Sequence, residues 1–412
     1  MTNRWIQLGA SLLGMIMIAN LQYAWTLFVT PLQQSTGWKL SAIQWAFTLF
    51  IVFETWVMPL EGWLIDRLGP RIFISIAAVL CTIGWSGLAY ARTLPELYTL
   101  YAIAGVGAAF VYSGSMATGL KWFPDKRGLA AGIIAGGFGS GSALFIPIIS
   151  QIIRADGYRT AFLYTGVFQG ILIFCAAQLM RNPPPHMTVP PAPKTSRLRV
   201  SHASEQFNTL EMLRTPHFYI LYLMATMMGI GGLMVTAQAA PVAATLNIGL
   251  TALTVAQSLG RVGNGAGRVF WGWVSDHLGR EKTMFIAFTL QAGCLLSVLT
   301  LGAWSGTWFI VTLFCVYFTW GEVYVLFPSA VADYFGAKNC TSNYSLMYTS
   351  KGVASIVAGG IAALLFERFG SWSAAFYGSA ALALCSALMA IGIHSLPLPS
   401  KNAQVVDTQV II

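Results

Sequence analysis

Three positively charged side chains, Arg261, Arg268 and Lys351, stand inside long apolar stretches of the sequence. The two arginines are seven residues apart, so on a helix they share one face, about 10 Å apart along the axis. An arginine offers a planar fork to a carboxylate, and a lysine offers a compact point charge. Cations on two helices that face one cavity would suit a small organic anion with two oxygen-bearing ends. The alternative is that they form structural pairs with buried acids.

Two carboxyl groups, Glu54 and Glu322, also fall in apolar stretches and leave the charge of this candidate site open. Arg268 and Lys351 alone would balance a dianion. If Arg261 and both glutamates are charged as well, one positive charge remains, which favours a monocarboxylate or a proton that travels with the substrate. If instead Arg261 and one glutamate form a structural pair, the site for a dianion is unchanged. We favour this last version.

Aromatic and amide side chains accompany the charged residues. A tyrosine can line a cavity with its ring and donate its hydroxyl group to a carboxylate. Tyr348 precedes Lys351 by one helical turn and lies on the same face. Each of these side chains alone is more often a packing residue, so the cluster gains its weight from the neighbouring cations. Its members are Gln22, Tyr23, Tyr112, Trp320, Tyr324 and Tyr348.

The elements that position these groups follow from the composition. Only 9% of the 412 residues are charged, whereas a soluble domain needs roughly a quarter. Most of the surface must therefore face lipid, where long apolar runs form helices of about 20 residues. The twelve predicted spans lie at about 5–30, 42–64, 72–92, 96–120, 129–153, 160–180, 216–238, 249–275, 283–303, 307–332, 340–365 and 372–395.

A proline-rich segment divides these spans into six and six. It begins Arg-Asn-Pro-Pro-Pro at residue 181 and continues into a basic, polar stretch, a composition typical of an extended linker. We therefore predict an N-terminal bundle (1–180), a cytoplasmic linker (181–215), a C-terminal bundle (216–395) and a cytoplasmic tail (396–412).

The basic residues orient the protein in its membrane. With an even number of spans both termini lie on one side, and that side holds fifteen of the 23 Lys and Arg residues. The positive-inside rule then places both termini in the cytoplasm, with the chain in the cell's inner membrane. The net charge of +9 thus has an explanation that needs no nucleic acid, and the lipid bilayer is the expected partner.

Signals for other chemistry are missing from the sequence. It has no glycine-rich nucleotide loop after a strand and no histidine in the middle of a span. The six cysteines lack metal-like spacing. No cluster of nucleophile, base and metal ligand indicates an enzyme. We therefore expect no cofactor, no metal and no enzymatic activity, and we expect a monomer.

The two halves repeat a motif after their second spans. Residues 62–69 read Gly-Trp-Leu-Ile-Asp-Arg-Leu-Gly, and residues 272–279 read Gly-Trp-Val-Ser-Asp-His-Leu-Gly, which indicates an internal repeat. Two six-helix halves, a central linker and this loop resemble the major facilitator superfamily. The resemblance implies an all-α membrane protein of two pseudo-symmetric bundles that rock around a midplane site. The residues predicted to latch or gate the loops are Asp66, Arg67, Arg71, Asp276 and Arg280.

A second set of segments is spread over nearly the whole chain, at Asn20–Leu27, Lys121–Ala130, Arg268–Gly272, Phe318–Gly321, Leu326–Ser329 and Lys351–Ile356. These segments are similar to the oxalate–formate antiporter family. In that family the arginine of span 8 and the lysine of span 11 bracket a carboxylate substrate, and aromatic residues from both halves enclose it. The resemblance gives these roles to Arg268, Lys351, Gln22, Tyr23, Tyr112, Trp320 and Tyr324.

The sequence departs from the family pattern at five positions. Phe138 replaces a tyrosine, Tyr348 replaces a tryptophan, and Arg261, Glu54 and Glu322 replace uncharged residues. Because most of these changes alter charge, they concern the identity of the substrate. The resemblance implies exchange of oxalate for formate by alternating access. The alternatives are proton-coupled uptake of a monocarboxylate such as lactate or pyruvate and, more remotely, an anion sensor that transports nothing.

Overall fold

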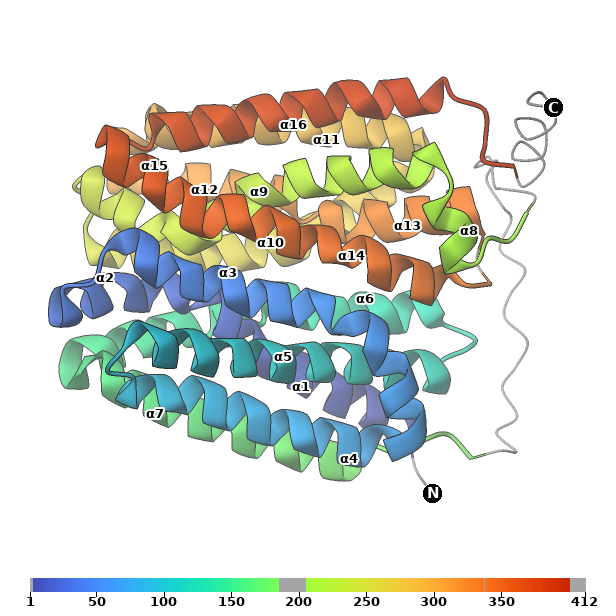
Figure 1. The fold of residues 1–412 in the computed structure, drawn as a ribbon, viewed down its shortest axis with the longest axis horizontal. Coiled ribbons are helices and arrows are strands. Elements are labelled where there is room, and N and C mark those ends of the chain that lie inside the picture. Colours follow the sequence, from blue (N-terminus) through green and yellow to red (C-terminus); the bar gives the residue numbers. More distant parts are fainter. Residues whose placement is uncertain (1–2, 185–204, 337, 401–412) are drawn as a thin grey trace, which may run out of the picture.

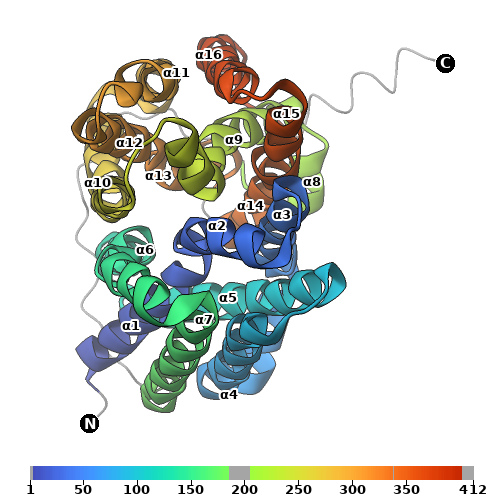
Figure 2. The same ribbon diagram turned by 90° about the vertical axis from the view of Figure 1, so that its left-hand side faces the viewer.

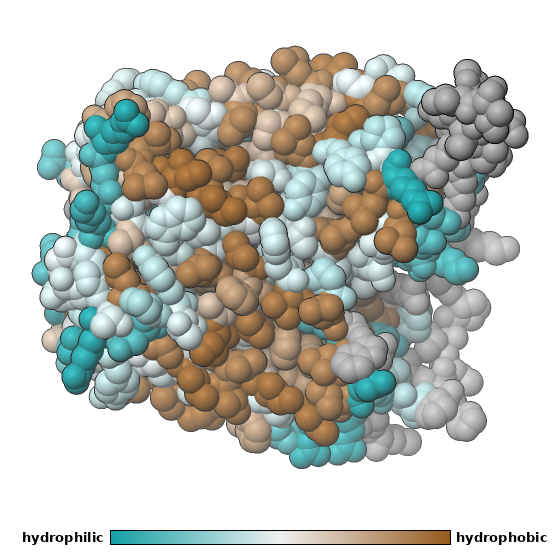
Figure 3. Space-filling view, in the orientation of Figure 1, coloured by the Kyte–Doolittle hydropathy of each residue, from teal (hydrophilic) through white to brown (hydrophobic). Residues whose placement is uncertain are grey.

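The structure is a computed structural model that describes residues 3–184, 205–336 and 338–400, without the side chains at 62, 63, 66, 127 and 128. Within these ranges the regular secondary structure is helical, in agreement with the predicted fold class. On the face shown in Figure 3, apolar side chains form a band across the middle of the molecule, and polar ones gather toward its two ends. This distribution suits a protein that is surrounded by lipid.

The helices up to Leu179 pack in one bundle, and those from Pro216 onwards pack in a second (Figure 2). The first bundle contains α1 (Arg4–Tyr23), α2 (Trp25–Thr36), α3 (Leu40–Trp56), α4 (Met58–Gly87), α5 (Leu94–Trp122), α6 (Arg127–Ser140) and α7 (Phe145–Leu179). The second contains α9 (Pro216–Thr245), α10 (Leu250–Leu278), α11 (Arg280–Leu299), α12 (Gly306–Trp320), α13 (Val323–Phe335), α14 (Cys340–Ile356), α15 (Ala362–Phe369) and α16 (Ser373–His394).

The segment predicted as a linker contains one short helix, α8 (Thr209–Leu213). The side chain of Asn208 accepts a hydrogen bond from the backbone N–H of Glu211, and the Glu211 carboxylate accepts one from the N–H of Asn208. This capping box stabilises a turn that hydropathy alone does not predict. Residues 185–204 of the predicted linker and 401–412 of the predicted tail lie outside the described ranges.

Ten helical segments of the described chain are long and apolar enough to cross a membrane. One of them, Leu129–Leu179, covers the two predicted spans 129–153 and 160–180, and the chain turns inside it at Gly157, where φ is 84°. α10, which carries two buried arginines, is not among these ten segments. With α10 and the double-length segment, the structure accounts for the twelve predicted spans.

Within the described residues, five spans change helix part of the way along. The changes fall at Ala24 between α1 and α2, at Val57 between α3 and α4, at the short turn Gly141–Ala143 between α6 and α7, at Gly321 between α12 and α13, and at the π-helical turn Val357–Ile361 between α14 and α15. Interrupted helices commonly form the substrate sites of transporters. At Gly321 packing requires glycine, because a Cβ atom there would lie 2.6 Å from the carbonyl oxygen of Asn264 on α10.

Hydrogen bonds join the two bundles at the end opposite the start of α1 and the end of α16 (Figure 1). The Glu367 carboxylate on α15 accepts from the backbone N–H and the hydroxyl group of Ser41 on α3, both at 2.8 Å. Further along α3, the side-chain amide of Gln44 donates to the carbonyl oxygen of Ala237 on α9 at 2.7 Å. These contacts hold the bundles together at that end.

Candidate substrate site

Arg268 lies on α10 at the boundary between the two bundles and is 5% exposed. Its Nη1 donates to the carbonyl oxygen of Ala135 on α6 at 2.9 Å, and its Nη2 donates to Oδ1 of Asn264 at 3.2 Å. The guanidinium carbon stands 4.5 Å from the centre of the Tyr324 ring. Among the described residues no carboxylate contacts Arg268, and its Nε has no hydrogen-bond partner. Its charge is therefore available to an anion.

Lys351 on α14 is equally buried, but a carboxylate already meets it. Its ammonium group donates to Oε2 of Glu54 on α3 at 2.8 Å and to Oε1 of Gln22 on α1 at 2.9 Å. A longer hydrogen bond, 3.4 Å, reaches the hydroxyl group of Tyr348. Because Glu54 and Gln22 belong to the first bundle, Lys351 bridges the two halves. A carboxylate that binds this lysine must therefore compete with Glu54 for it.

Arg261, two turns before Arg268 on α10, is fully buried between two tyrosine rings. Its guanidinium carbon is 4.2 Å from the ring centre of Tyr23 and 3.8 Å from that of Tyr317. Its Nη2 donates to Oε1 of Gln257 at 3.1 Å, whereas Nε and Nη1 have no partner in the described part of the chain. The predicted pair between Arg261 and a glutamate is therefore wrong, because aromatic faces rather than a carboxylate accommodate this charge.

Glu322 lies at the junction of α12 and α13 and is fully buried, and neither of its carboxyl oxygens has a partner among the residues that the structure describes. It follows Trp320 by two residues, about 200° around a helix, so it points away from the aromatic side chains of the site. Of the charged groups predicted to share the cavity, the structure thus brings together three cations and Glu54. Their sum is two positive charges when Glu54 is ionised and three when Glu54 carries a proton.

The predicted aromatic residues meet around the cations and come from both bundles. Tyr112 stacks on Tyr348, with 5.8 Å between ring centres, and Tyr348 is 6.4 Å from Tyr324. Trp320 packs edge-on against Tyr324 at 5.3 Å. The ring centre of Phe138 lies 5.6 Å from the ammonium group of the lysine and 5.5 Å from the ring of Tyr112. The site is therefore walled by rings, and the Tyr23 hydroxyl group and the Trp320 indole N–H, which have no partner among the described residues, are free to donate to an anion.

The space beside the lysine is small in this conformation. A cavity of about 20 Å³ is lined by Tyr324, Tyr344, Tyr348 and Lys351 among others. A single water molecule needs roughly 10–15 Å³ by this measure. A dicarboxylate does not fit, so the bundles must move apart before a substrate enters.

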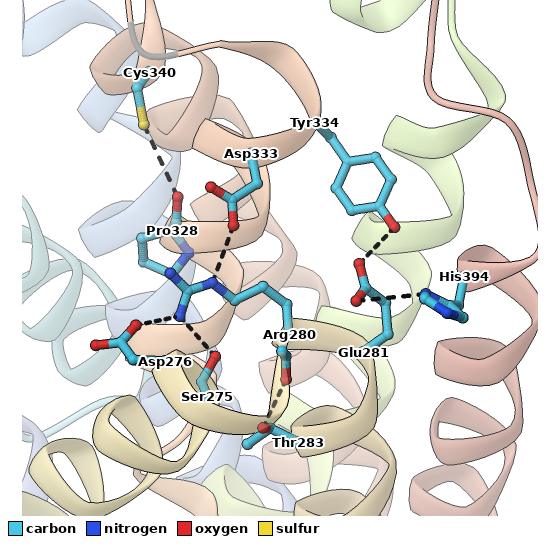
Figure 4. A network of polar contacts seen from close by, with 11 residues as sticks. Ser275, Asp276, Arg280, Glu281, Thr283, Pro328, Asp333, Tyr334, Cys340 and His394 are labelled. Carbon is cyan, nitrogen blue, oxygen red and sulfur yellow. Dashed lines mark hydrogen bonds and ion pairs between the residues drawn. The ribbon is translucent and has the colours of Figure 1, made fainter. Parts of the chain in front are cut away.

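The repeated loop of the second bundle forms a polar network of its own (Figure 4). Arg280 donates from Nη1 to Asp276 at 2.9 Å and from Nε to Asp333 at 3.0 Å, and so ties the start of α11 to α13. Gly279 adopts a φ of 90°, a backbone conformation that favours glycine. These contacts suit a structural latch, and they involve none of the three buried cations.

The corresponding loop of the first bundle repeats the backbone geometry, since φ at Gly69 is 73°. Arg71 donates from Nε to Oε1 of Gln178 on α7 at 2.8 Å. The side chain of Arg67 is exposed, and that of Asp66 lies outside the part of the chain that the structure describes. The latch or gate role of this loop stays a prediction.

Sequence reasoning missed the residues that fix the arginines. Gln257 and Asn264 each precede an arginine by four residues, and this spacing on one helix was a usable signal. Tyr317 comes from another helix, where its ring covers Arg261 and its hydroxyl group donates to Oε1 of Gln257 at 3.2 Å. No pattern along the chain connects Tyr317 with α10, so only the folded structure reveals it.

Twelve helical spans in two bundles, with buried cations at the boundary, define a membrane transporter, and the comparison with known families agrees. The profile of the Major Facilitator Superfamily matches residues 10–355, and the chain belongs to this superfamily. It is accordingly a multi-pass membrane transporter and not an enzyme.

Within the superfamily, an oxalate:formate antiporter of Oxalobacter formigenes is 38% identical over 91% of this chain and 87% of its own length. That identity confirms the predicted resemblance to the oxalate–formate antiporter family. The MFS-type transporter YhjX of Escherichia coli is 25% identical over 86% of each chain. Monocarboxylate transporter 12 of Xenopus laevis is 23% identical over 81% of this chain and 76% of its own length. These relatives give the anion-sensor alternative no support.

Proposed function

We propose that this chain is a secondary carrier of small carboxylates and that its main reaction is the exchange of oxalate for formate. The observation that carries the proposal is Arg268, a buried cation between the bundles that no carboxylate contacts within the described residues. A cation inside a membrane is costly unless a partner meets it. The name of the Oxalobacter formigenes relative supports exchange of these two anions.

In this proposal the substrate binds between Arg268 and Lys351, inside the aromatic walls. One carboxylate end takes the guanidinium fork, and the other displaces Glu54 from the ammonium group. An anion neutralises positive charges that repel one another when the bundles close over them. The loaded site therefore closes more readily than the empty site, and exchange follows because the empty carrier returns slowly.

The proposal also covers the membrane in which the chain lies, the side on which its termini lie and the number of copies that transport requires. Both termini face the cytoplasm, the chain lies in the inner membrane, and one copy suffices for transport. The distribution of Lys and Arg over the loops supports the orientation. Labelling of cysteines introduced near Arg4 with a membrane-impermeant reagent tests it, since reaction in intact cells contradicts cytoplasmic termini.

Counterflow in proteoliposomes tests the site. Vesicles that contain unlabelled formate are placed in labelled oxalate, and exchange is read as accumulation of label. Arg268→Gln and Lys351→Gln should each lower the rate by about 10²-fold or more, since truncating one side of a buried charged contact costs about 2–5 kcal/mol. Both variants should elute as folded monomers. Full exchange in either variant would defeat the assignment.

One contact favours a second function, the proton-coupled uptake of a monocarboxylate. A single carboxylate that takes Lys351 leaves Glu54 buried without its cation, and binding of a proton relieves that cost. The similarity to monocarboxylate transporters supports this alternative. Uptake of lactate or pyruvate that depends on an inward proton gradient in the wild type, and fails in Glu54→Gln, would favour it. Oxalate exchange that is indifferent to pH would exclude it.

A further inference from the structure

A third carboxyl group, Glu61 on α4, is buried in the first bundle and takes no part in the site described above. It is 1% exposed, and neither of its oxygens has a hydrogen-bond partner in the part of the chain that the structure describes. The hydroxyl group of Ser113 on α5 faces it. An ionisable side chain inside a membrane span is expensive, and where one persists it commonly marks the path of an ion or a proton.

Glu61 stands on the same side of span 2 as Glu54. The two residues are seven apart, about 10 Å along a helix axis. Val57, at the junction of α3 and α4, has helical angles (φ −81°, ψ −24°), so the junction preserves the helix face. Beyond Glu61, α4 turns at Gly69, where an added Cβ atom would lie 4.0 Å from Asn182, close to the end of α7 that contacts Gln7 near the start of α1. Glu61 therefore lies between the substrate site and that end.

We propose that Glu54 and Glu61 form a proton path along span 2. The inference rests on the proposed function, because it requires a substrate carboxylate to displace Glu54 from Lys351. Once displaced, the Glu54 carboxylate accepts a proton from the side on which the substrate enters. When the substrate leaves and Glu54 recovers its ion pair, that proton passes through intervening water molecules to Glu61, whose carboxylic acid releases a proton on the side of the termini. One proton thus crosses the membrane with each substrate carboxylate that takes the lysine.

The neighbours of the two carboxyl groups explain why displacing Glu54 from Lys351 leads to protonation of Glu54. Glu54 contacts Lys351, which also donates to Gln22, and its charge reaches the hydroxyl groups of Tyr23, Tyr101, Tyr112, Tyr324 and Tyr348. Glu61 faces Ser113 and Glu54. Amide, hydroxyl and phenol groups are neutral near pH 7. Among the described neighbours, Lys351 is therefore the cation that keeps Glu54 ionised. When a substrate carboxylate takes Lys351, the buried Glu54 carboxylate is neutralised by binding a proton.

Two measurements on the full chain in proteoliposomes separate this path from substrate binding. Oxalate counterflow at equal pH on both sides needs no net movement of protons. Net oxalate uptake, followed with a pH-sensitive dye inside the vesicles, reports the protons that accompany the substrate. We expect the wild type to do both, with net uptake the slower of the two because it requires the return of the empty carrier. Glu61→Gln should retain counterflow but slow the accompanying proton movement by about a hundredfold, the lower range of what a positioned proton donor contributes.

Glu322→Gln is the matched control, because it also neutralises a fully buried carboxyl group without a partner among the described residues, but in the other bundle. It should leave both measurements unchanged. If Glu61→Gln yields little folded protein, Glu61→Asp replaces it, and the shorter carboxyl group should slow proton movement while counterflow persists.

Wild-type proton movement in the Glu61 variants overturns the path. So does oxalate uptake by the wild type without any change of pH. Loss of proton movement in Glu322→Gln would place the proton site elsewhere and also reject the path. The absence of oxalate or formate counterflow in the wild type would instead refute the proposed function.

Discussion

Replacing Glu54 by glutamine should make the carrier bind oxalate more tightly. In the structure the Glu54 carboxylate lies 2.8 Å from the Lys351 ammonium group, which is the contact that a substrate carboxylate needs. The substrate must break this ion pair before it forms its own. Glutamine keeps the size of the side chain, and its oxygen can still accept a hydrogen bond, but it removes the negative charge with which the substrate competes.

The size of the effect follows from this geometry. Two unit charges 2.8 Å apart attract each other by about 6 kcal/mol at an effective dielectric constant of about 20. Desolvation of the two buried groups offsets most of that attraction. The net value of a hydrogen bond to a charged group is about 1.5–3 kcal/mol, and the substrate recovers this amount when Glu54 is absent. Oxalate should therefore bind roughly 30-fold more tightly, which corresponds to about 2 kcal/mol.

Equilibrium binding of labelled oxalate to the purified protein in detergent measures this change as a difference in Kd. Glu322→Gln serves as the control, because it neutralises a buried carboxyl group that points away from the cations, and its Kd should equal that of the wild type. An unchanged Kd in Glu54→Gln would show that the glutamate does not compete for Lys351. Weaker binding would show that the ion pair holds the lysine in place for the substrate. Either result would refute the reasoning.

Three further predictions concern the guanidinium fork, the closed end and the packing of span 10. Arg268→Lys keeps the charge but loses the fork, so oxalate exchange should fall by about tenfold or more; equal exchange would contradict a two-pronged contact. Glu367→Gln weakens the contact between α3 and α15. Added to a Gln44→Cys variant, it should make the cysteine react faster with a membrane-impermeant thiol reagent, and unchanged labelling would show that this contact does not close that end. Gly321→Ala brings a Cβ atom 2.6 Å from an α10 carbonyl oxygen and should lower the free energy of unfolding by about 1–3 kcal/mol. Its control is Gly293→Ala, where nothing lies within 4 Å, and equal melting temperatures would reject the packing argument.

The architecture was largely predictable from the sequence because lipid imposes a strong constraint on backbone hydrogen bonding. Apolar runs of sufficient length must form helices, so the twelve spans could be placed to within a few residues. The exceptions are local. Apolar composition does not reveal where a span changes helix, as at Val57, and it does not predict α8, which depends on the capping contacts of Asn208 and Glu211.

The candidate site was predictable in its members but not in its pairings. Arg268, Lys351 and the tyrosines of both bundles lie close together, as the sequence and the family resemblance indicated, and their role in binding a substrate stays a prediction. The carboxylate that contacts a cation is Glu54, and its partner is Lys351 rather than Arg261. Glu322, which has the same composition signal as Glu54, points away from the site. A charge count along the sequence could not separate these two glutamates, because it carries no information about the direction of a side chain across helices.

By itself the sequence determined that this protein is a helical membrane transporter with cations buried in its second half. Hydropathy and the high cost of charge in lipid can be assessed from the position of each residue along the chain. Only the tertiary structure decided that Glu54 and Lys351, 297 residues apart, form an ion pair across the two bundles, while two rings enclose Arg261. The physical reason is that contacts between bundles depend on how many side chains pack along their whole boundary, and spacing along a single helix does not specify that packing.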